Sequence, residues 1–261
     1  MPLRALLRLI GFALAGLIGV LAGALPALPA SWLGSALERG SGGRALLLET
    51  TGTVWHGTGR PALRSGGQTD DESVRAFPGP VEWRFAGLAL LPLRMRLELS
   101  GPAVFAAPVV LDIGATGPVA LTAGRMALPV AVFDGIGAPF NTLRLGGRLD
   151  ATWGELTWAR GLPQGPLSLE WSDARSALSP VAPLGAYRLD LRPDENGFAL
   201  TLATLQGPLT IEGSGNWQRS GRFGFTGRAS AAAEQRAQLQ PLMNMLGPSR
   251  PDGVALRIGS S

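Results

Sequence analysis

Apolar and polar residues alternate with a period of two along much of the chain after residue 40. The alternation is clearest in Leu-Arg-Met-Arg-Leu-Glu-Leu at 93–99 and Tyr-Arg-Leu-Asp-Leu-Arg at 187–192. Successive side chains of a strand point to opposite faces, so such a run has one apolar and one polar face. Antiparallel sheets with one solvated face show this pattern. The sequence therefore predicts a mainly β body, a curved and mostly antiparallel sheet with a few short helices.

Strand-like runs fill most of the body and are separated by turn residues. The runs lie at 45–55, 81–86, 93–100, 103–113, 119–127, 143–153, 155–159, 167–171, 186–192, 198–205, 209–213, 222–229 and 254–258. Gly-Pro pairs, which favour turns, stand at run boundaries at 79–80, 101–102, 117–118, 165–166 and 207–208. Trp83, Trp153 and Trp217 recur at intervals of 70 and 64 residues. This spacing indicates stacked hairpins in one continuous sheet.

Three segments favour helix. Residues 31–39 would form a short helix with Ser31 as its N-cap and Gly40 after its end. A weaker helical pattern covers 129–136. Strong helix formers occupy 231–246, where Pro241 is expected to kink or split the helix.

The N-terminal segment predicts a membrane anchor. Residues 9–28 carry no charge, and as a helix they would span about 30 Å, the thickness of the hydrocarbon core. Arg4 and Arg8 precede this segment, so the positive-inside rule keeps residues 1–8 in the cytoplasm as a stub. Residues 29–261 would then form one β-rich periplasmic domain. The alternative is a cleaved signal peptide with a site near 22–24, which also exports the body.

The charge of the body argues against a nucleic-acid partner. The chain has 23 basic and 19 acidic side chains, and every basic one is arginine. Arg4 and Arg8 precede the apolar segment, which leaves 21 arginines against 19 acids in the body. These arginines alternate with acids, whereas nucleic-acid binding needs a concentrated basic stripe. The sequence therefore predicts no nucleic-acid partner.

The residues of common catalytic chemistry are missing from the sequence. There is no cysteine or lysine, and His56 is the one histidine. Thiol catalysis, a P-loop lysine and a multi-histidine metal site are therefore excluded. His56 is interpreted as a half-exposed turn residue, and the acidic run 70–72 as part of a mobile loop at 64–76 rather than a metal site. We expect no enzyme activity, no cofactor and no metal, and a packing role for most tryptophans.

Two glycine-rich segments carry a family resemblance. The first reads Gly52, Thr53, Val54, Trp55, His56, Gly57, and the second contains Gly207, Pro208, Leu209, Gly213, Gly215 and Trp217. With the charged stub, the single span and the segments 178–187 and 242–247, their order resembles protein N of the bacterial type II secretion system. Both segments are interpreted as hairpin turns whose glycines allow a tight backbone and whose tryptophan packs beneath.

The resemblance implies an accessory inner-membrane component, crossing once, with most of the chain in the periplasm. Such a protein supports the export of folded proteins across the outer membrane, and its partners would be the inner-membrane platform, the secretin or both. It would be a non-catalytic scaffold that presents sheet edges and one apolar face, and the motif residues would be candidates for interaction. The alternative function is periplasmic lipid binding or lipid transfer, with an acyl-chain groove in the curved sheet.

Overall fold

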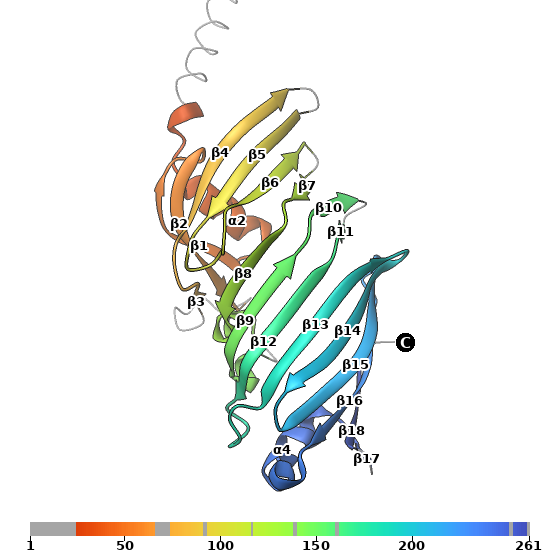
Figure 1. Cartoon of the computed structure of the whole chain (residues 1–261). Coiled ribbons are helices and arrows are strands. Elements are labelled where there is room, and N and C mark those ends of the chain that lie inside the picture. The colour runs from red at the N-terminus through yellow and green to blue at the C-terminus, as the bar shows by residue number, and fades with distance from the viewer. Residues whose placement is uncertain are drawn as a thin grey trace, which may run out of the picture.

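A computed structural model describes residues 25–65, 74–90, 93–115, 117–137, 140–159, 162–250 and 253–259. These residues form two antiparallel sheets of nine strands each and a few short helices, and neither sheet closes on itself (Figure 1). The prediction of a mainly β, mostly antiparallel body is confirmed. The prediction of one continuous sheet is wrong, because the strands divide into two.

The first sheet contains β1 (Ala45–Gly52), β2 (His56–Arg64), β3 (Val74–Ala76), β4 (Val81–Leu90), β5 (Leu93–Ser100), β6 (Val109–Gly114), β7 (Gly117–Leu121), β10 (Leu156–Ala159) and β11 (Leu162–Gln164). Its strand order is β1-β2-β4-β5-β6-β7-β10-β11, with β3 paired to β2. The predicted strand 45–55 ends at Gly52, and the strand His56–Arg64 that follows it was not predicted.

The second sheet contains β8 (Gly124–Pro129), β9 (Leu145–Trp153), β12 (Leu167–Ser176), β13 (Gly185–Asp194), β14 (Gly197–Gln206), β15 (Leu209–Gln218), β16 (Phe223–Ala231), β17 (Ser249–Arg250) and β18 (Gly253–Gly259). Its order is β17-β18-β16-β15-β14-β13-β12-β9-β8.

The chain crosses between the sheets more than once, so the two sheets are interleaved in sequence. It leaves the first sheet after β7, forms β8 and β9 in the second, returns for β10 and β11, and then completes the second sheet. The predicted strand 119–127 therefore divides at residues 122–123, where the chain changes sheet. Trp153 of β9 joins the sheets, because its indole Nε1–H donates to the Thr122 carbonyl at 2.9 Å.

A shared apolar core lies at this junction. Val109 of the first sheet and Trp153 of the second are 1% and 7% exposed, and both belong to one cluster with Ala151. Partly buried apolar side chains from β5, β7, β10 and β12 pack against it. Burial of this shared surface holds the two sheets together.

Each helix differs from its predicted form in some detail. The helix α2 (Ser31–Gly40) starts after Ala30 rather than Ser31, has no side-chain cap, and includes Gly40. The 129–136 pattern forms a 3-10 helix, η3 (Val130–Ile136), followed by α3 (Phe140–Leu143). The 231–246 helix is shorter than predicted, because β16 continues to Ala231 and η4 (Ala233–Gln235) precedes α4 (Arg236–Leu246). α4 is not split at Pro241.

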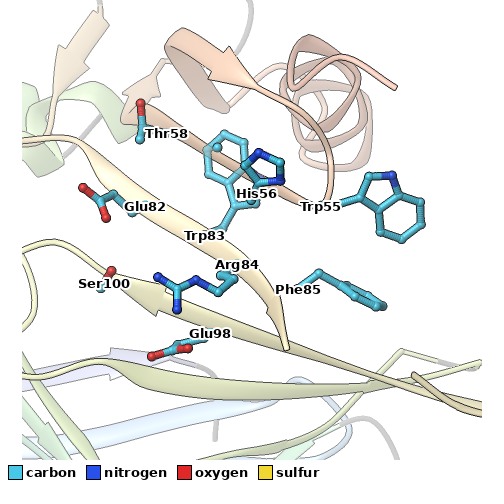
Figure 2. Close-up of a pocket in the computed structure, with 10 residues that line it drawn as sticks. Trp55, His56, Thr58, Glu82, Trp83, Arg84, Phe85, Glu98 and Ser100 are labelled. Atoms are coloured by element: carbon cyan, nitrogen blue, oxygen red, sulfur yellow. The ribbon is translucent and has the colours of Figure 1, made fainter. Parts of the chain in front are cut away.

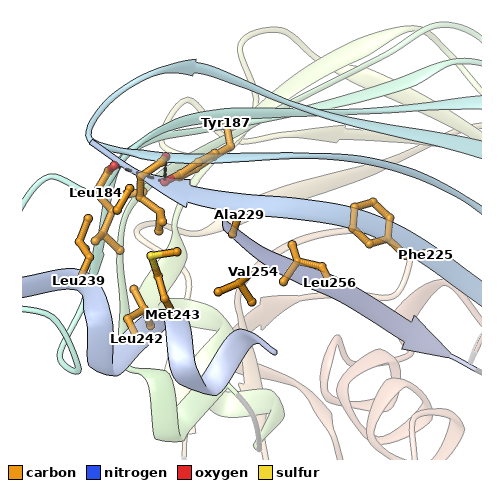
Figure 3. Close-up of a cluster of buried hydrophobic side chains, with 12 residues drawn as sticks. Leu184, Tyr187, Phe225, Ala229, Leu239, Leu242, Met243, Val254 and Leu256 are labelled. Carbon is orange, nitrogen blue, oxygen red and sulfur yellow. Dashed lines mark hydrogen bonds between the residues drawn. The ribbon is translucent and has the colours of Figure 1, made fainter. Parts of the chain in front are cut away.

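α4 covers one end of the second sheet (Figure 1). Leu239, Leu242 and Met243 of the helix pack against β13, β15, β16 and β18, in a cluster that includes Val254 (Figure 3). Tyr187 lies within this cluster, and its hydroxyl donates to the Leu209 carbonyl at 2.8 Å. The hydroxyl is therefore satisfied inside an apolar environment, and burial raises the pKa of Tyr187 well above its usual range.

Two predicted segments lie wholly or partly outside the described residues. The anchor 9–28 is described only from residue 25, where Leu25–Ala27 form the 3-10 helix η1. No helix in the described part of the chain is long and apolar enough to cross a membrane. The predicted loop 64–76 is shorter than expected, because Arg64 belongs to β2 and Val74–Ala76 to β3; residues 66–73, with the acidic run, are outside the described residues.

Candidate interaction surfaces

The first glycine-rich motif forms the hairpin turn between β1 and β2, as predicted. Gly52 and Gly57 are paired across the turn, and Gly52 has a φ of +89°, which glycine adopts without strain. Thr53 N–H donates to the His56 carbonyl at 2.8 Å. Val54 N–H donates to the Leu28 carbonyl at 2.9 Å, so the turn also holds the chain that enters the body.

The tryptophan beneath this turn is Trp83 of β4 rather than the motif's own Trp55. Trp83 pairs directly with Gly57, where an added Cβ would lie 2.6 Å from the Trp83 ring. Its Nε1–H donates to the Thr53 carbonyl at 3.1 Å, and the side chain is 5% exposed. Trp55 instead contacts Phe85 edge to face, with 5.1 Å between ring centroids. The glycine at 57 is therefore required both by the hairpin backbone at Thr51 and by the non-local contact with Trp83.

A hollow of about 660 Å³ lies beside this hairpin on β2, β4 and β5. Its polar side chains form two rows across the strands, one with His56, Arg84 and Glu98 and the other with Thr58, Glu82 and Ser100 (Figure 2). His56, Arg84 and Glu82 are exposed. His56 thus lies at the start of a strand beside a turn, and the row can offer hydrogen bonds and charge to a partner surface.

Arg84 and Glu98 were not predicted from the sequence to be site residues. Arg84 pairs with His56 and with Glu98 through strand register, at separations of 28 and 14 residues. The alternation of acid and base over 82–84 was visible in the sequence. The identity of the neighbouring strand was not, because it depends on the unpredicted strand β2.

The second glycine-rich motif divides into a turn and a strand. Gly207 and Pro208 connect β14 to β15, as predicted, and Gly207 has a φ of +122°. Leu209, the first residue of β15, is 2% exposed and lies in the core beneath α4. This part of the motif anchors the sheet to α4.

The hairpin interpretation is wrong for Gly213 and Gly215, which lie in the middle of β15. An added Cβ at Gly213 would lie 2.6 Å from the Phe225 ring of the next strand, and Gly215 lies against the backbone of Gly224. Phe225 therefore occupies the space that a side chain at 213 would take. Trp217 is not packed beneath a turn; it is 41% exposed and contacts Phe198 at 6.4 Å between ring centroids.

Strand register separates the second sheet into an apolar and a polar face. One row of directly paired residues crosses the sheet as Gly124, Trp153, Leu167, Leu191, Leu200, Gly215, Phe225 and Ile258. The next row on the opposite face reads Arg125, Thr152, Ser168, Asp190, Thr201, Ser214, Thr226 and Arg257. We call the first the apolar face and the second the polar face.

The apolar face is only partly covered within the described residues. Ile258 is 58% exposed and Trp217 is 41% exposed, whereas Phe198, which pairs with Trp217 from the neighbouring strand, is 4% exposed. Exposed large apolar side chains that continue a buried face are typical of surfaces for protein or lipid partners. In the part of the chain that the structure describes, no group of three or more His, Cys, Asp or Glu residues could hold a metal ion.

Comparison with known proteins places the chain in a family. The family model described as type II secretion system (T2SS), protein N, matches residues 46–257. No curated protein and no solved structure matches the chain. The matched range runs from β1 to β18 and includes both glycine-rich motifs, so it covers both sheets. The resemblance first carried by those two motifs is thereby confirmed, and the chain belongs to the protein N family of the type II secretion system.

Proposed function

We propose that this chain is a non-catalytic scaffold of the type II secretion machinery, held at the inner membrane by residues 9–28. Residues 29–261 would lie in the periplasm and contact the inner-membrane platform, the secretin or both. Family membership supports a role as an accessory secretion component. The observation that carries the scaffold role is the exposed part of the apolar face, at Trp217 and Ile258.

The absence of catalysis in this proposal rests on residue chemistry. The sequence has no cysteine, no lysine and one histidine, and that histidine is exposed on a strand surface. His56 and Arg84 are exposed, so the row His56–Arg84–Glu98 lacks the closed, water-poor surroundings in which charged groups act most strongly. The row is better suited to polar contacts at the rim of a protein interface.

A deletion strain tests the proposed function. Loss of the protein should impair the release of secreted proteins or the assembly of secretin multimers, and the full chain expressed in trans should restore both. Culture supernatants and detergent-resistant secretin bands provide the two readouts. Normal secretion together with normal secretin multimers in the deletion strain would contradict the scaffold role.

The anchor has its own test. If residues 9–28 remain attached, N-terminal sequencing of the protein from the membrane fraction should start at or near Met1. A mature start near Leu25 would show instead that the apolar segment is a cleaved signal peptide. Either result leaves the body exported, so this measurement concerns the tether alone.

Lipid handling is a second candidate function, favoured by the same apolar face. Acyl chains could contact the end of the apolar row, where Ile258 is 58% exposed and would otherwise face water. Mass spectrometry of the body purified without detergent would detect co-purified lipid. Replacing Ile258 by Lys should then remove that lipid, whereas Arg257→Gln on the polar face should not.

A further inference from the structure

The outer edges of the two sheets differ in how they are covered. Strand β1 is covered by α2, where an added Cβ at Gly34 would lie 3.3 Å from the Leu47 carbonyl oxygen. Strand β8 is covered by the segment before β6, since Ala106 N–H donates to β8 at 3.0 Å and Ala127 N–H donates back at 2.9 Å. Strand β11 has three residues, and its Pro163 has no N–H to offer. These are common ways of protecting a sheet edge.

Within the described residues, strand β18 lacks this protection along its second half. The two-residue strand β17 pairs only with Gly253 and Val254. Ala255 N–H points away from β16, because it donates to the Pro248 carbonyl at 3.4 Å. Backbone groups alternate sides along a strand, so the N–H and C=O of Arg257 also point outward. Among the described residues, no strand pairs with that side of Arg257.

The side chains at this edge indicate what kind of strand would fit. Ile258 ends the apolar row and is 58% exposed, so an apolar residue beside it would extend the buried face. Arg257 is exposed on the polar face and has no ion-pair partner among the described residues. Arg228 pairs with Ala255 and is a diagonal neighbour of Arg257, but Glu212 of β15 pairs directly with Arg228, so the unmatched positive charge at this corner is that of Arg257. Opposite charges on paired strands stabilise a sheet, and like charges destabilise it.

We infer that β18 receives an extended segment of another protein as an added strand, with an apolar side chain beside Ile258 and a carboxylate beside Arg257. The inference deepens the proposed scaffold function, on which it rests, by naming the edge and the chemistry of the partner. A second copy of this chain is the poorer occupant. Antiparallel pairing of two β18 strands around this point brings the two Arg257 side chains opposite or diagonal to one another.

Matched peptides test this edge on the full chain in detergent. The probes are nine-residue peptides of alternating isoleucine and glutamate, the same peptide with lysine for glutamate, and the glutamate peptide with N-methyl groups on its alternate, strand-facing amides. The glutamate peptide should bind and slow hydrogen exchange at the Arg257 amide. The lysine peptide should bind about tenfold more weakly, and the N-methylated peptide should not bind.

Three variants separate the contribution of the Arg257 backbone to peptide binding from that of its charge. Arg257→Pro removes the outward N–H and should therefore abolish binding of the peptide. Pairing with β16 should remain, because the N–H groups that face β16 belong to neighbouring residues. Arg257→Ala keeps the N–H and should lose the preference for glutamate over lysine. Arg257→Glu should reverse that preference. Thermal unfolding by circular dichroism checks that each variant is folded; if Arg257→Pro unfolds, the N-methylated peptide still tests the backbone contact.

Equal binding of the N-methylated and unmodified peptides, or protection that excludes Arg257, would overturn the inference. Self-association of the full chain that is lost in Arg257→Pro would overturn it in favour of a second copy. These outcomes are independent of the deletion strain. A strain that secretes normally contradicts the scaffold role, whereas impaired secretion without peptide binding contradicts only this edge.

Discussion

The two sheets contain the same tryptophan–glycine arrangement in different surroundings. In the first sheet Trp83 faces Gly57 and donates to the Thr53 carbonyl; in the second, Trp153 faces Gly124 and donates to the Thr122 carbonyl. In each case a strand residue opposite a glycine places its indole over the glycine and satisfies its N–H on nearby backbone. The spacing of Trp83 and Trp153 thus corresponds to two equivalent packing arrangements, one in each sheet.

The difference between the pairs lies in what each one holds together. Trp83 stabilises a local hairpin beside a surface hollow, whereas Trp153 belongs to the cluster through which the two sheets share a core. Trp217, the third member of the predicted repeat, does neither, because it lies between Phe198 and Phe223 and is 41% exposed. The same tryptophan–glycine contact therefore stabilises one hairpin in the first sheet and the junction between the two sheets in the second.

The largest expected effect is the truncation of Trp153. Trp153→Ala removes a buried ring from the shared core and should lower the free energy of unfolding by about 3–5 kcal/mol, the upper range for such substitutions. Trp83→Ala should cost less, because Trp83, although buried, belongs to none of the apolar clusters in the described part of the chain. Urea unfolding followed by circular dichroism measures both, with Trp217→Ala as an exposed control. Equal losses for Trp83→Ala and Trp153→Ala would contradict the contrast.

The facing glycines provide a second, smaller effect. A Cβ at Gly124 would lie 2.7 Å from both Trp153 and Val109, whereas one at Gly57 would first meet the Thr51 carbonyl oxygen. Gly124→Ala and Gly57→Ala should each lower the free energy of unfolding by about 1–3 kcal/mol through overpacking.

The two glycine variants should respond differently to a smaller ring. Trp153→Phe should partly relieve Gly124→Ala, because side chains cause that clash. Trp83→Phe should relieve Gly57→Ala much less, because backbone at Thr51 remains in the way. Double-mutant cycles measure this coupling. Similar coupling energies at the two sites would show that the hairpin backbone yields as readily as the core.

The smallest expected effect concerns ion pairs on the outer surfaces of the sheets. Arg96 in the first sheet donates to both carboxylate oxygens of Asp112, and this hydrogen bonding holds the pKa of Asp112 below its usual range. In the second sheet Arg188 Nη2 donates to Glu170 at 3.0 Å. Asp112→Asn should lower the melting temperature slightly more than Glu170→Gln at neutral pH, because the bidentate geometry is stronger.

The pH dependence of that effect has a definite sign. A carboxyl whose pKa is lower in the folded state stabilises the fold above its unfolded pKa, and this contribution is lost as the pH falls through the folded pKa. The difference between the wild type and Asp112→Asn should therefore shrink as the pH falls below about 4, through the lowered folded-state pKa of Asp112. A difference that persists or grows under acid would show that the ion pair is not its origin.

Strands were predicted correctly where the local alternation of apolar and polar residues agrees with the two faces of the strand in the folded protein. The alternating runs at 93–99 and 187–192 lie in β5 and β13, with apolar and polar side chains on separate faces. The strand β2 was missed because Gly57, Gly59 and Pro61 are poor strand formers. Gly57 is needed to face Trp83, and Gly59 lies against Leu47. Neither contact is visible in the local sequence.

The candidate surfaces show the same division. The turns at Gly52–Gly57 and Gly207–Pro208 follow from local backbone chemistry and were predicted. The predicted strand 209–213 stopped short of Gly215, because the continuation depends on close contact with the Gly224 backbone of the next strand. The open edge at Arg257 is likewise a property of what surrounds β18 rather than of its own seven residues.

The sequence by itself determined the β class, which residues of most strands lie on the apolar or the polar face, the two glycine turns and the absence of common catalytic groups. Each of these depends on side-chain chemistry or on neighbours within a few positions. The tertiary structure alone decided that there are two sheets, that the chain crosses between them at residues 122–123, and which edge stays open. Those features depend on pairing between distant strands, where burial of a shared apolar core outweighs local preference.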